Sequence, residues 1–121
     1  MTLIGRLRKR AEFLFVKGGT KFVAPSLVLQ ARVRGPQVGN ARFGFTASKA
    51  IGGSVQRNRA RRRLKEAVRL AAGRAAVGGH DYVLIARSGT LQRRFAELIK
   101  DLERALAKVH APPRQRDEKR S

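Results

Sequence analysis

Residues 54–70 have the sequence SVQRNRARRRLKEAVRL, which predicts one long helix with an apolar face and a cationic face. Successive residues of a helix are rotated by about 100°. With that rotation, one sector collects the apolar side chains of Ala60, Leu64, Ala67, Val68 and Ala71. We therefore expect this helix to bury one face against other elements and to expose a wide basic surface.

The basic surface is dense, because six cations fall within nine positions before the first carboxylate at Glu66: Arg57, Arg59, Arg61, Arg62, Arg63 and Lys65. Like charges one turn apart destabilise a helix, so we expect an external polyanion to neutralise them. Arginine favours nucleic acid, since its guanidinium can donate two hydrogen bonds to one phosphate and can stack on bases. The alternative is a solvated cationic face without a partner. Asn58 either binds a phosphate or 2′-hydroxyl or caps the first turn.

Strands are expected before this helix. Residues 26–33, SLVLQARV, alternate between apolar and other side chains, which is typical of a strand with one buried face. Turn residues at 34–40 separate them from a second strand at 41–48, ARFGFTAS. We expect these two strands to pair antiparallel. A short extended segment, KFVA at 21–24, is expected before them.

The N-terminal segment predicts one short helix. Residues 11–19, AEFLFVKGG, fit a helix that stops at Gly18 and Gly19, because paired glycines lose too much backbone entropy to continue it. Residues 1–10 are basic, and we expect them to lack regular structure.

Ser54 is the expected N-cap of the long helix, and residues 73–81 are expected to end it. Residues 81–87, DYVLIAR, form a nearly continuous apolar run, which indicates a central strand.

Thr90 is expected to cap a last helix, whose apolar residues recur at helical spacing up to Val109. Residues 111–121 are rich in charge and proline, so they predict a disordered basic tail.

These elements give the order α-β-β-β-α-β-α within residues 1–110. They predict a single α+β domain that forms a two-layer α/β sandwich. By the general rule, the strand, helix and strand at its centre would cross over right-handed.

Composition limits the function further. The 121 residues contain 28 Lys and Arg against 8 Asp and Glu, a net charge of +20, and no Cys. Such charge favours nucleic acid as the partner. An anionic membrane surface is less favoured, because the chain has no Trp and its six Phe are spread along the sequence. No membrane span or signal peptide is indicated, and we expect a soluble, cytoplasmic protein.

No catalytic constellation is evident. His80 and His110 are thirty residues apart, and we expect both at the surface. The carboxylates are scattered, so a protein-bound metal is not expected. Gly52 and Gly53 could place backbone amides near a phosphate, but they lack the spacing of a nucleotide-binding loop. The sequence therefore predicts a protein that binds rather than one whose own side chains catalyse.

Aromatic residues suggest a second site. Phe43 and Phe45 share one face of a strand, and we expect them in the core. Phe13 is either a core residue or part of an aromatic surface for unpaired nucleotides. A short helix packed over an open sheet would leave a cleft at its margin, and Ser48 and Lys49 would line that cleft.

Residues 42–67, RFGFTASKAIGGSVQRNRARRRLKEA, resemble the signature of the bacterial ribonuclease P protein component. The matching residues are Gly44, Ser48, Lys49, Gly52, Val55, Arg57, Asn58, Arg59, Arg61, Arg62 and Lys65. The resemblance extends from Arg6 to the last helix. Ala50 and Gln30 depart from it, since the family often has a cation and an aromatic there. The segment from Phe13 to Gly19 is one residue shorter than in some relatives, which leaves open whether Phe13 or Phe15 lines the cleft.

The resemblance implies a ribosomal S5 domain 2-like sandwich with a left-handed β-α-β crossover. It implies an accessory subunit of an endoribonuclease that pairs 1:1 with a catalytic RNA and helps to remove the 5′ leader of precursor tRNA. The catalytic centre and Mg²⁺ are then expected on the RNA. The residues implied to contact the catalytic RNA are Arg57, Asn58, Arg59, Arg61, Arg62 and Lys65. Those implied to line the leader cleft are Phe13, Phe15, Phe45, Ser48 and Lys49.

Two other functions share these features. A ribosomal or other structural RNA-binding protein would not prefer precursor over mature tRNA. A self-sufficient nuclease would cleave precursor tRNA without the RNA subunit. A DNA-binding protein is less favoured, because no helix-turn-helix pair frames the basic segment.

Overall fold

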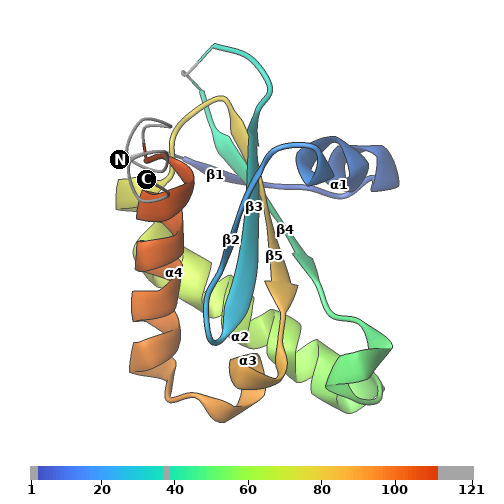
Figure 1. Ribbon diagram of the computed structural model, residues 1–121. Coiled ribbons are helices and arrows are strands. Elements are labelled where there is room, and N and C mark those ends of the chain that lie inside the picture. The colour runs from blue at the N-terminus through green and yellow to red at the C-terminus, as the bar shows by residue number, and fades with distance from the viewer. Residues whose placement is uncertain (1–2, 37–38, 112–121) are drawn as a thin grey trace, which may run out of the picture.

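The computed structural model describes residues 3–36 and 39–111 (Figure 1). The elements follow one another as β1 (Ile4–Arg6), α1 (Arg10–Lys17), β2 (Thr20–Val23), β3 (Leu27–Val33), β4 (Ala41–Thr46), the 3₁₀ helix η1 (Lys49–Ile51), α2 (Ser54–Ala75), β5 (His80–Ala86), α3 (Ser88–Gln92) and α4 (Phe95–Val109). The predicted α+β class is confirmed. The predicted tail at 111–121 lies, apart from Ala111, outside the described residues.

The five strands form one sheet in the order β1-β4-β5-β3-β2. β5 is central, parallel to β4 and antiparallel to β3. The expected direct pairing of β3 with β4 is therefore wrong, because β5 lies between them. Six of the seven β5 residues are buried, and the central position is the one that removes such a strand most completely from water.

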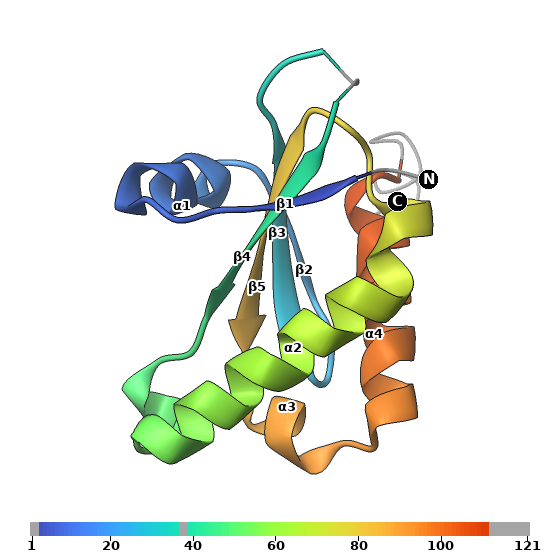
Figure 2. The ribbon, with the colours of Figure 1, turned by 180° about the vertical axis from the view of Figure 1, so that it is seen from behind.

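α2 connects the two parallel strands β4 and β5. With α2 in front of the sheet, both strands run downward, and in the lower part of the view, where α2 passes over them, β5 lies to the right of β4 (Figure 2), which makes the crossover left-handed. The expectation from family resemblance is thus confirmed, and the general right-handed rule does not hold here.

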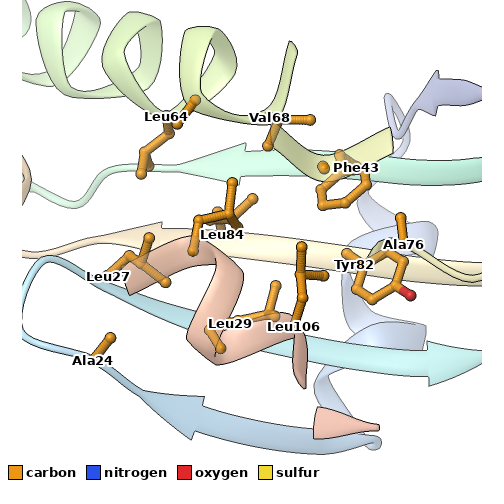
Figure 3. Packing of buried hydrophobic residues seen from close by; sticks show 14 of the residues in the cluster. Ala24, Leu27, Leu29, Phe43, Leu64, Val68, Ala76, Tyr82, Leu84 and Leu106 are labelled. Carbon is orange, nitrogen blue, oxygen red and sulfur yellow. The ribbon is translucent and has the colours of Figure 1, made fainter. Parts of the chain in front are cut away.

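Two helices and the sheet enclose the main core. α2 and α4 cover one face of the sheet, where Leu27, Phe43, Leu64, Tyr82 and Leu106 pack together (Figure 3). This is the predicted two-layer sandwich. α1 covers part of the opposite face with a small cluster of Leu7, Val16 and Val83, so it adds a partial third layer.

The predicted apolar face of α2 is largely confirmed. Ala60, Leu64, Ala67 and Val68 are buried, and Ala72 completes the stripe in place of the half-buried Ala71. The helix begins at Ser54 with Gly53 as the N-cap, one residue before the expected cap. Gly52 has a φ of +141°, a conformation that side chains disfavour, so it turns the chain into α2.

Three elements were not predicted: β1, η1 and α3. β1 lies in the segment expected to lack regular structure, and it pairs in parallel with β4. α3 is separate from α4, because the chain bends at Arg93 and Arg94. Thr90 belongs to α3, where its Oγ1 accepts the Arg87 N–H at 3.0 Å, so it does not cap the last helix as expected.

The two histidines are not separate surface residues. His80 is buried at the start of β5, His110 is half-buried at the end of α4, and their ring centroids are 4.9 Å apart. Tyr82 Oη accepts the Val77 N–H at 2.9 Å and lies 2.6 Å from His110 Nε2, to which it can donate. Burial raises the pKa of Tyr82 to about 12. Burial, and then the neighbouring His80, lower the pKa of His110.

His110 predicts a pH-dependent stability. Its pKa in the folded chain lies below the ordinary value of 6.5, so unfolding favours proton uptake. The melting temperature is therefore expected to fall as the pH drops below about 6.5. Replacing His110 with Gln should flatten this dependence in thermal melts between about pH 7.5 and 5.5, above the range where most carboxylates titrate. An unchanged pH profile in that variant would contradict the assignment to His110.

Candidate nucleic-acid interface

The cationic face of α2 contains side chains that the rest of the chain leaves free. Arg59 and Arg62 are exposed and form no hydrogen bond or ion pair within the described residues. Asn58 is exposed, and its Oδ1 accepts Arg61 Nη2 at 2.6 Å. Arg57 is half-buried, and its Nε is buried without a partner. These groups, together with the half-buried Lys65, form a surface available to an anion.

Arg63 has a different role from its neighbours. Its Nε donates to the Thr90 carbonyl at 2.7 Å, and its Nη2 donates to the Arg93 carbonyl. Its guanidinium also lies 5.7 Å from the centre of the Phe95 ring. Arg63 therefore braces α2 against α3 and the start of α4. Farther along the helix, Arg69 is paired with Glu66.

A cleft opens beside this surface, where β1 ends. β1 pairs with β4 only as far as Phe43, so this edge of β4 has no strand partner beyond that residue. Two adjoining hollows of about 480 and 570 Å³ lie there. We call them together the β4-edge cleft. Its lining residues are Ile4, Gly5, Arg6, Leu7, Arg8, Phe13, Phe43, Phe45, Arg61, Lys65, Val68 and Arg69.

The β4-edge cleft is strongly cationic. Arg6 and Arg8 approach it from the N-terminal segment, and Arg61 and Lys65 from α2. Within the described chain, no Asp or Glu side chain lines either hollow. Burial, and then the charges of Arg6 and Arg61, lower the pKa of Lys65. An anion bound in the cleft would relieve this repulsion.

Of the three phenylalanines that line the cleft, Phe43 is buried in the main core, so two aromatic rings remain, those of Phe13 and Phe45. Phe13 comes from α1 and lies directly against β4, since a Cβ added at Gly44 would be 2.5 Å from its ring. Only glycine leaves this space. Phe45, the next residue of β4, faces the α2 side of the sheet, where it packs at the margin of the main core. The two rings thus reach the cleft from opposite faces of the sheet.

Three residues predicted to line the cleft do not do so. Phe15 lies two positions after Phe13, on another side of α1, because residues two apart do not share a helical face. There it lies under Arg32, whose guanidinium is 4.3 Å from the ring centre. Ser48 and Lys49 are exposed and lie outside the cleft lining, because β4 ends at Thr46 and the chain turns into η1.

Arg6 and Arg8 were missed as cleft residues. The signal was present as a short alternation, in which Leu7 is buried between two exposed arginines. Such a three-residue pattern is too short to indicate a strand on its own.

A family model described as Ribonuclease P matches residues 2–110. The chain belongs to the ribonuclease P protein family. A ribonuclease P protein component from Gluconacetobacter diazotrophicus is 52% identical over 105 residues, which cover 86% of this chain and 90% of the relative. That from Ruegeria pomeroyi is 48% identical over 111 residues, covering 90% and 89%. The resemblance of residues 42–67 to this family is thereby confirmed.

Solved structures of ribonuclease P proteins share the fold. The protein from Thermotoga maritima has a TM-score of 0.73 and 27% identity, with 88% of this chain and 98% of the other covered. The protein from Staphylococcus aureus has a TM-score of 0.71 and 23% identity, with 87% of this chain and 94% of the other covered. At that identity the likeness is evidence for the shared fold only. As a ribonuclease P protein component, the chain takes part in an endoribonuclease complex of tRNA processing.

Two further observations concern membrane-spanning helices and metal sites. No helix in residues 3–36 and 39–111 is long and apolar enough to cross a membrane. In the same residues, no three His, Asp or Glu side chains gather in an arrangement suited to a metal ion.

Proposed function

We propose that this chain binds the catalytic RNA of ribonuclease P through the exposed face of α2 and holds the 5′ leader of precursor tRNA in the β4-edge cleft. In a 1:1 holoenzyme it would thereby support Mg²⁺-dependent removal of the leader. The observation on which this proposal depends is the cleft itself, which combines unneutralised cations with two aromatic rings and shares Arg61 and Lys65 with α2.

The α2 surface suits a folded RNA. Arg59 and Arg62 have no partner among the described residues, so binding a phosphate would break no internal contact. The Nε of Arg57, which is buried without a partner, would donate a hydrogen bond to an acceptor of the RNA. Each such contact also releases counterions from the RNA, which makes the affinity dependent on salt.

The β4-edge cleft suits a single strand. Aromatic rings stack on the faces of unpaired bases, whereas the bases of a duplex already stack on one another. Phe13 and Phe45 supply the rings, and the cations around them can contact the phosphates of the same strand. A leader nucleotide would therefore find both kinds of contact within one cleft.

We place the chemistry on the RNA. Mg²⁺ prefers carboxylate and phosphate oxygens, and the cleft offers cations instead. In this proposal Mg²⁺ is bound by the RNA subunit and the substrate, while the protein extends recognition beyond the tRNA body. Protein free of RNA should then leave precursor tRNA uncleaved.

Phe13→Ala is expected to weaken the leader preference, defined as the ratio of precursor to mature tRNA affinity of the holoenzyme. The loss should be roughly tenfold, since stacking on one aromatic ring is worth about 1–3 kcal/mol. The measurement is binding and 5′ processing at low Mg²⁺, after reconstitution with the catalytic RNA of the same organism.

Phe15→Ala is the matched control, because Phe15 lies on the same helix but outside the cleft. It should leave the leader preference unchanged. If Phe13→Ala weakened precursor and mature tRNA equally, Phe13 would have a folding role. If Phe13→Ala left the ratio of precursor to mature tRNA affinity unaltered, the leader would bind outside the β4-edge cleft.

A further inference from the structure

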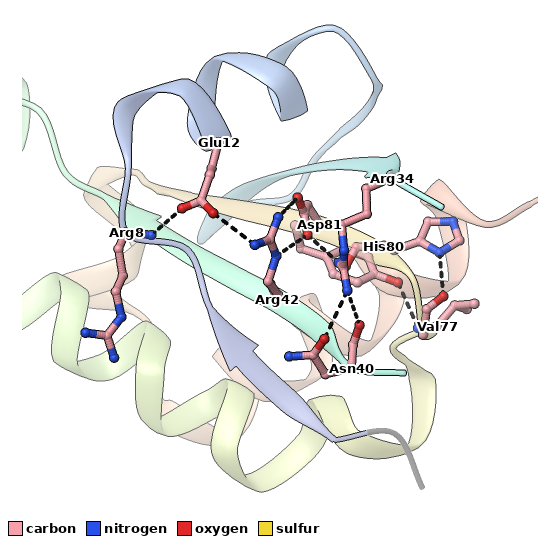
Figure 4. A network of polar contacts seen from close by, with 10 residues as sticks. Arg8, Glu12, Arg34, Asn40, Arg42, Val77, His80 and Asp81 are labelled. Atoms are coloured by element: carbon pink, nitrogen blue, oxygen red, sulfur yellow. Dashed lines mark hydrogen bonds and ion pairs between the residues drawn. The ribbon is translucent and has the colours of Figure 1, made fainter. Parts of the chain in front are cut away.

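Glu12 lies outside the β4-edge cleft, yet its carboxylate joins two elements that form the cleft (Figure 4). Oε1 accepts the backbone N–H groups of Arg8 and Lys9, each at 2.8 Å, and so closes the first turn of α1. Oε2 accepts Arg42 Nη1 from β4 at 2.9 Å. Hydrogen bonds from the backbone N–H groups of Lys9 and Arg8 lower the pKa of Glu12.

Arg42 extends this attachment to the centre of the sheet. Its Nε and Nη2 donate to Asp81 Oδ1 and Oδ2 on β5 at 2.9 and 2.8 Å. Asp81 is only 1% exposed, and its Oδ1 also accepts Arg34 Nη1 at 2.6 Å (Figure 4). The start of α1 is therefore tied through two side chains to the central strand.

Apolar packing holds α1 through Val16 and through the partly buried rings of Phe13 and Phe15. Of its eight residues, Val16 is the one that is buried, and it lies near the C-terminus of the helix. Phe13 is half-buried beside the cleft. The first turn has no fully buried side chain, and among the described residues its side-chain hydrogen bonds are those of Glu12.

Two of the residues beside this anchor belong to the cleft. Glu12 holds the N–H of Arg8, which lines both hollows, and precedes Phe13, which lines the first. We infer that Glu12 is a positioning residue for the 5′ leader, since it fixes Arg8 and Phe13 in the cleft without itself lining it. This inference rests on the proposed function of the cleft.

A double-mutant cycle tests the inference in the full chain, reconstituted with the catalytic RNA. Glu12→Ala should reduce the leader preference by up to the roughly tenfold loss expected for Phe13→Ala. The double variant should lose clearly less than the product of the two single losses, because Glu12 acts partly through Phe13. Affinity for the catalytic RNA should stay within about twofold, since α2 takes no part in the network.

Two further variants separate positioning from general effects. Glu12→Gln keeps an oxygen for the backbone N–H groups but loses the ion pair with Arg42, so its loss should be intermediate. Glu103→Ala is the matched control, as an exposed carboxylate of α4 that has no ion pair within the described residues. It should leave the leader preference unchanged. Faster amide hydrogen exchange at Arg8 and Lys9 in Glu12→Ala would report directly on the loosened turn.

The outcomes distinguish the inference from the function on which it rests. If Phe13→Ala lowers the leader preference and Glu12→Ala does not, Glu12 has no positioning role. Strictly multiplicative losses, or an equal loss of RNA assembly, would also overturn it. If neither Phe13→Ala nor any replacement of a cleft cation alters the leader preference, the proposed function of the cleft is refuted. The inference on Glu12, which rests on that function, is then refuted with it.

Discussion

A variant with Arg57, Arg59 and Arg62 all replaced by Gln is expected to bind the catalytic RNA about a hundredfold more weakly at about 0.1 M salt. Each lost phosphate contact removes about 0.7 to 0.9 from the slope of log affinity against log salt. The three together should flatten that slope by about 2 to 3. The measurement is a salt titration of RNA binding for the variant and the parent chain.

The structure explains why this loss should concern binding and not folding. The side chains of Arg59 and Arg62 are exposed and form no hydrogen bond or ion pair with the other described residues. Their removal also relieves repulsion along α2, so the folded chain should be at least as stable as before. An intact thermal transition with a flattened salt slope is the expected combination.

Two controls belong with this variant. Replacing Lys17, Lys21 and Arg104 removes three exposed charges that do not belong to α2, and should change the slope much less. Arg63→Gln removes one cation from α2 itself, but one that donates to the carbonyls of Thr90 and Arg93. It should lower stability and leave the salt slope nearly unchanged. A slope unaffected by the triple variant would refute the assignment of α2 to the RNA.

Arg62 and Arg63 show what helical periodicity can and cannot predict. The pattern of residues 54–70 correctly separates the apolar face from the cationic one. It cannot show that Arg63 is the arginine that donates to backbone carbonyls, because those carbonyls belong to residues 90 and 93, outside the helix. The free and the structural cations were therefore distinguishable only once α3 was placed.

Strand order has the same limit. The apolar run of residues 81–87 indicated a central strand, and this is confirmed. The pairing of β3 with β4 was nevertheless predicted from their closeness in sequence. A strand that arrives later in the chain can enter between two earlier ones, and the alternation within each strand is the same in either order.

Buried polar groups were the least predictable feature. Asp81 stands at the start of an apolar run and looks like a strand boundary, yet it is buried between Arg34 and Arg42. The two histidines meet only because α4 ends beside β5. Such contacts join residues dozens of positions apart, so local patterns contain no signal for them.

Asp81→Asn is expected to lower the free energy of unfolding by about 3 kcal/mol, the low end of the range for breaking a buried ion pair. The amide cannot balance two guanidinium groups, which would remain close together at the edge of the core. The low end applies because Arg34 and Arg42 keep 26% and 28% of their side chains in solvent, against 1% for Asp81. Urea denaturation measures the change.

Glu66→Gln provides the contrast, because its pair with Arg69 is exposed and such pairs add little to stability. If Asp81→Asn proved as mild as this control, the network would not support the fold. Asp81→Asn should also reduce the leader preference under conditions where the variant is folded, since Arg42 would lose its fixed position beneath Glu12. Glu12→Ala should share that functional loss with a smaller loss of stability, because Asp81 would keep both arginines. The two variants together therefore separate the contribution of the network to the stability of the sheet from its contribution to the position of α1.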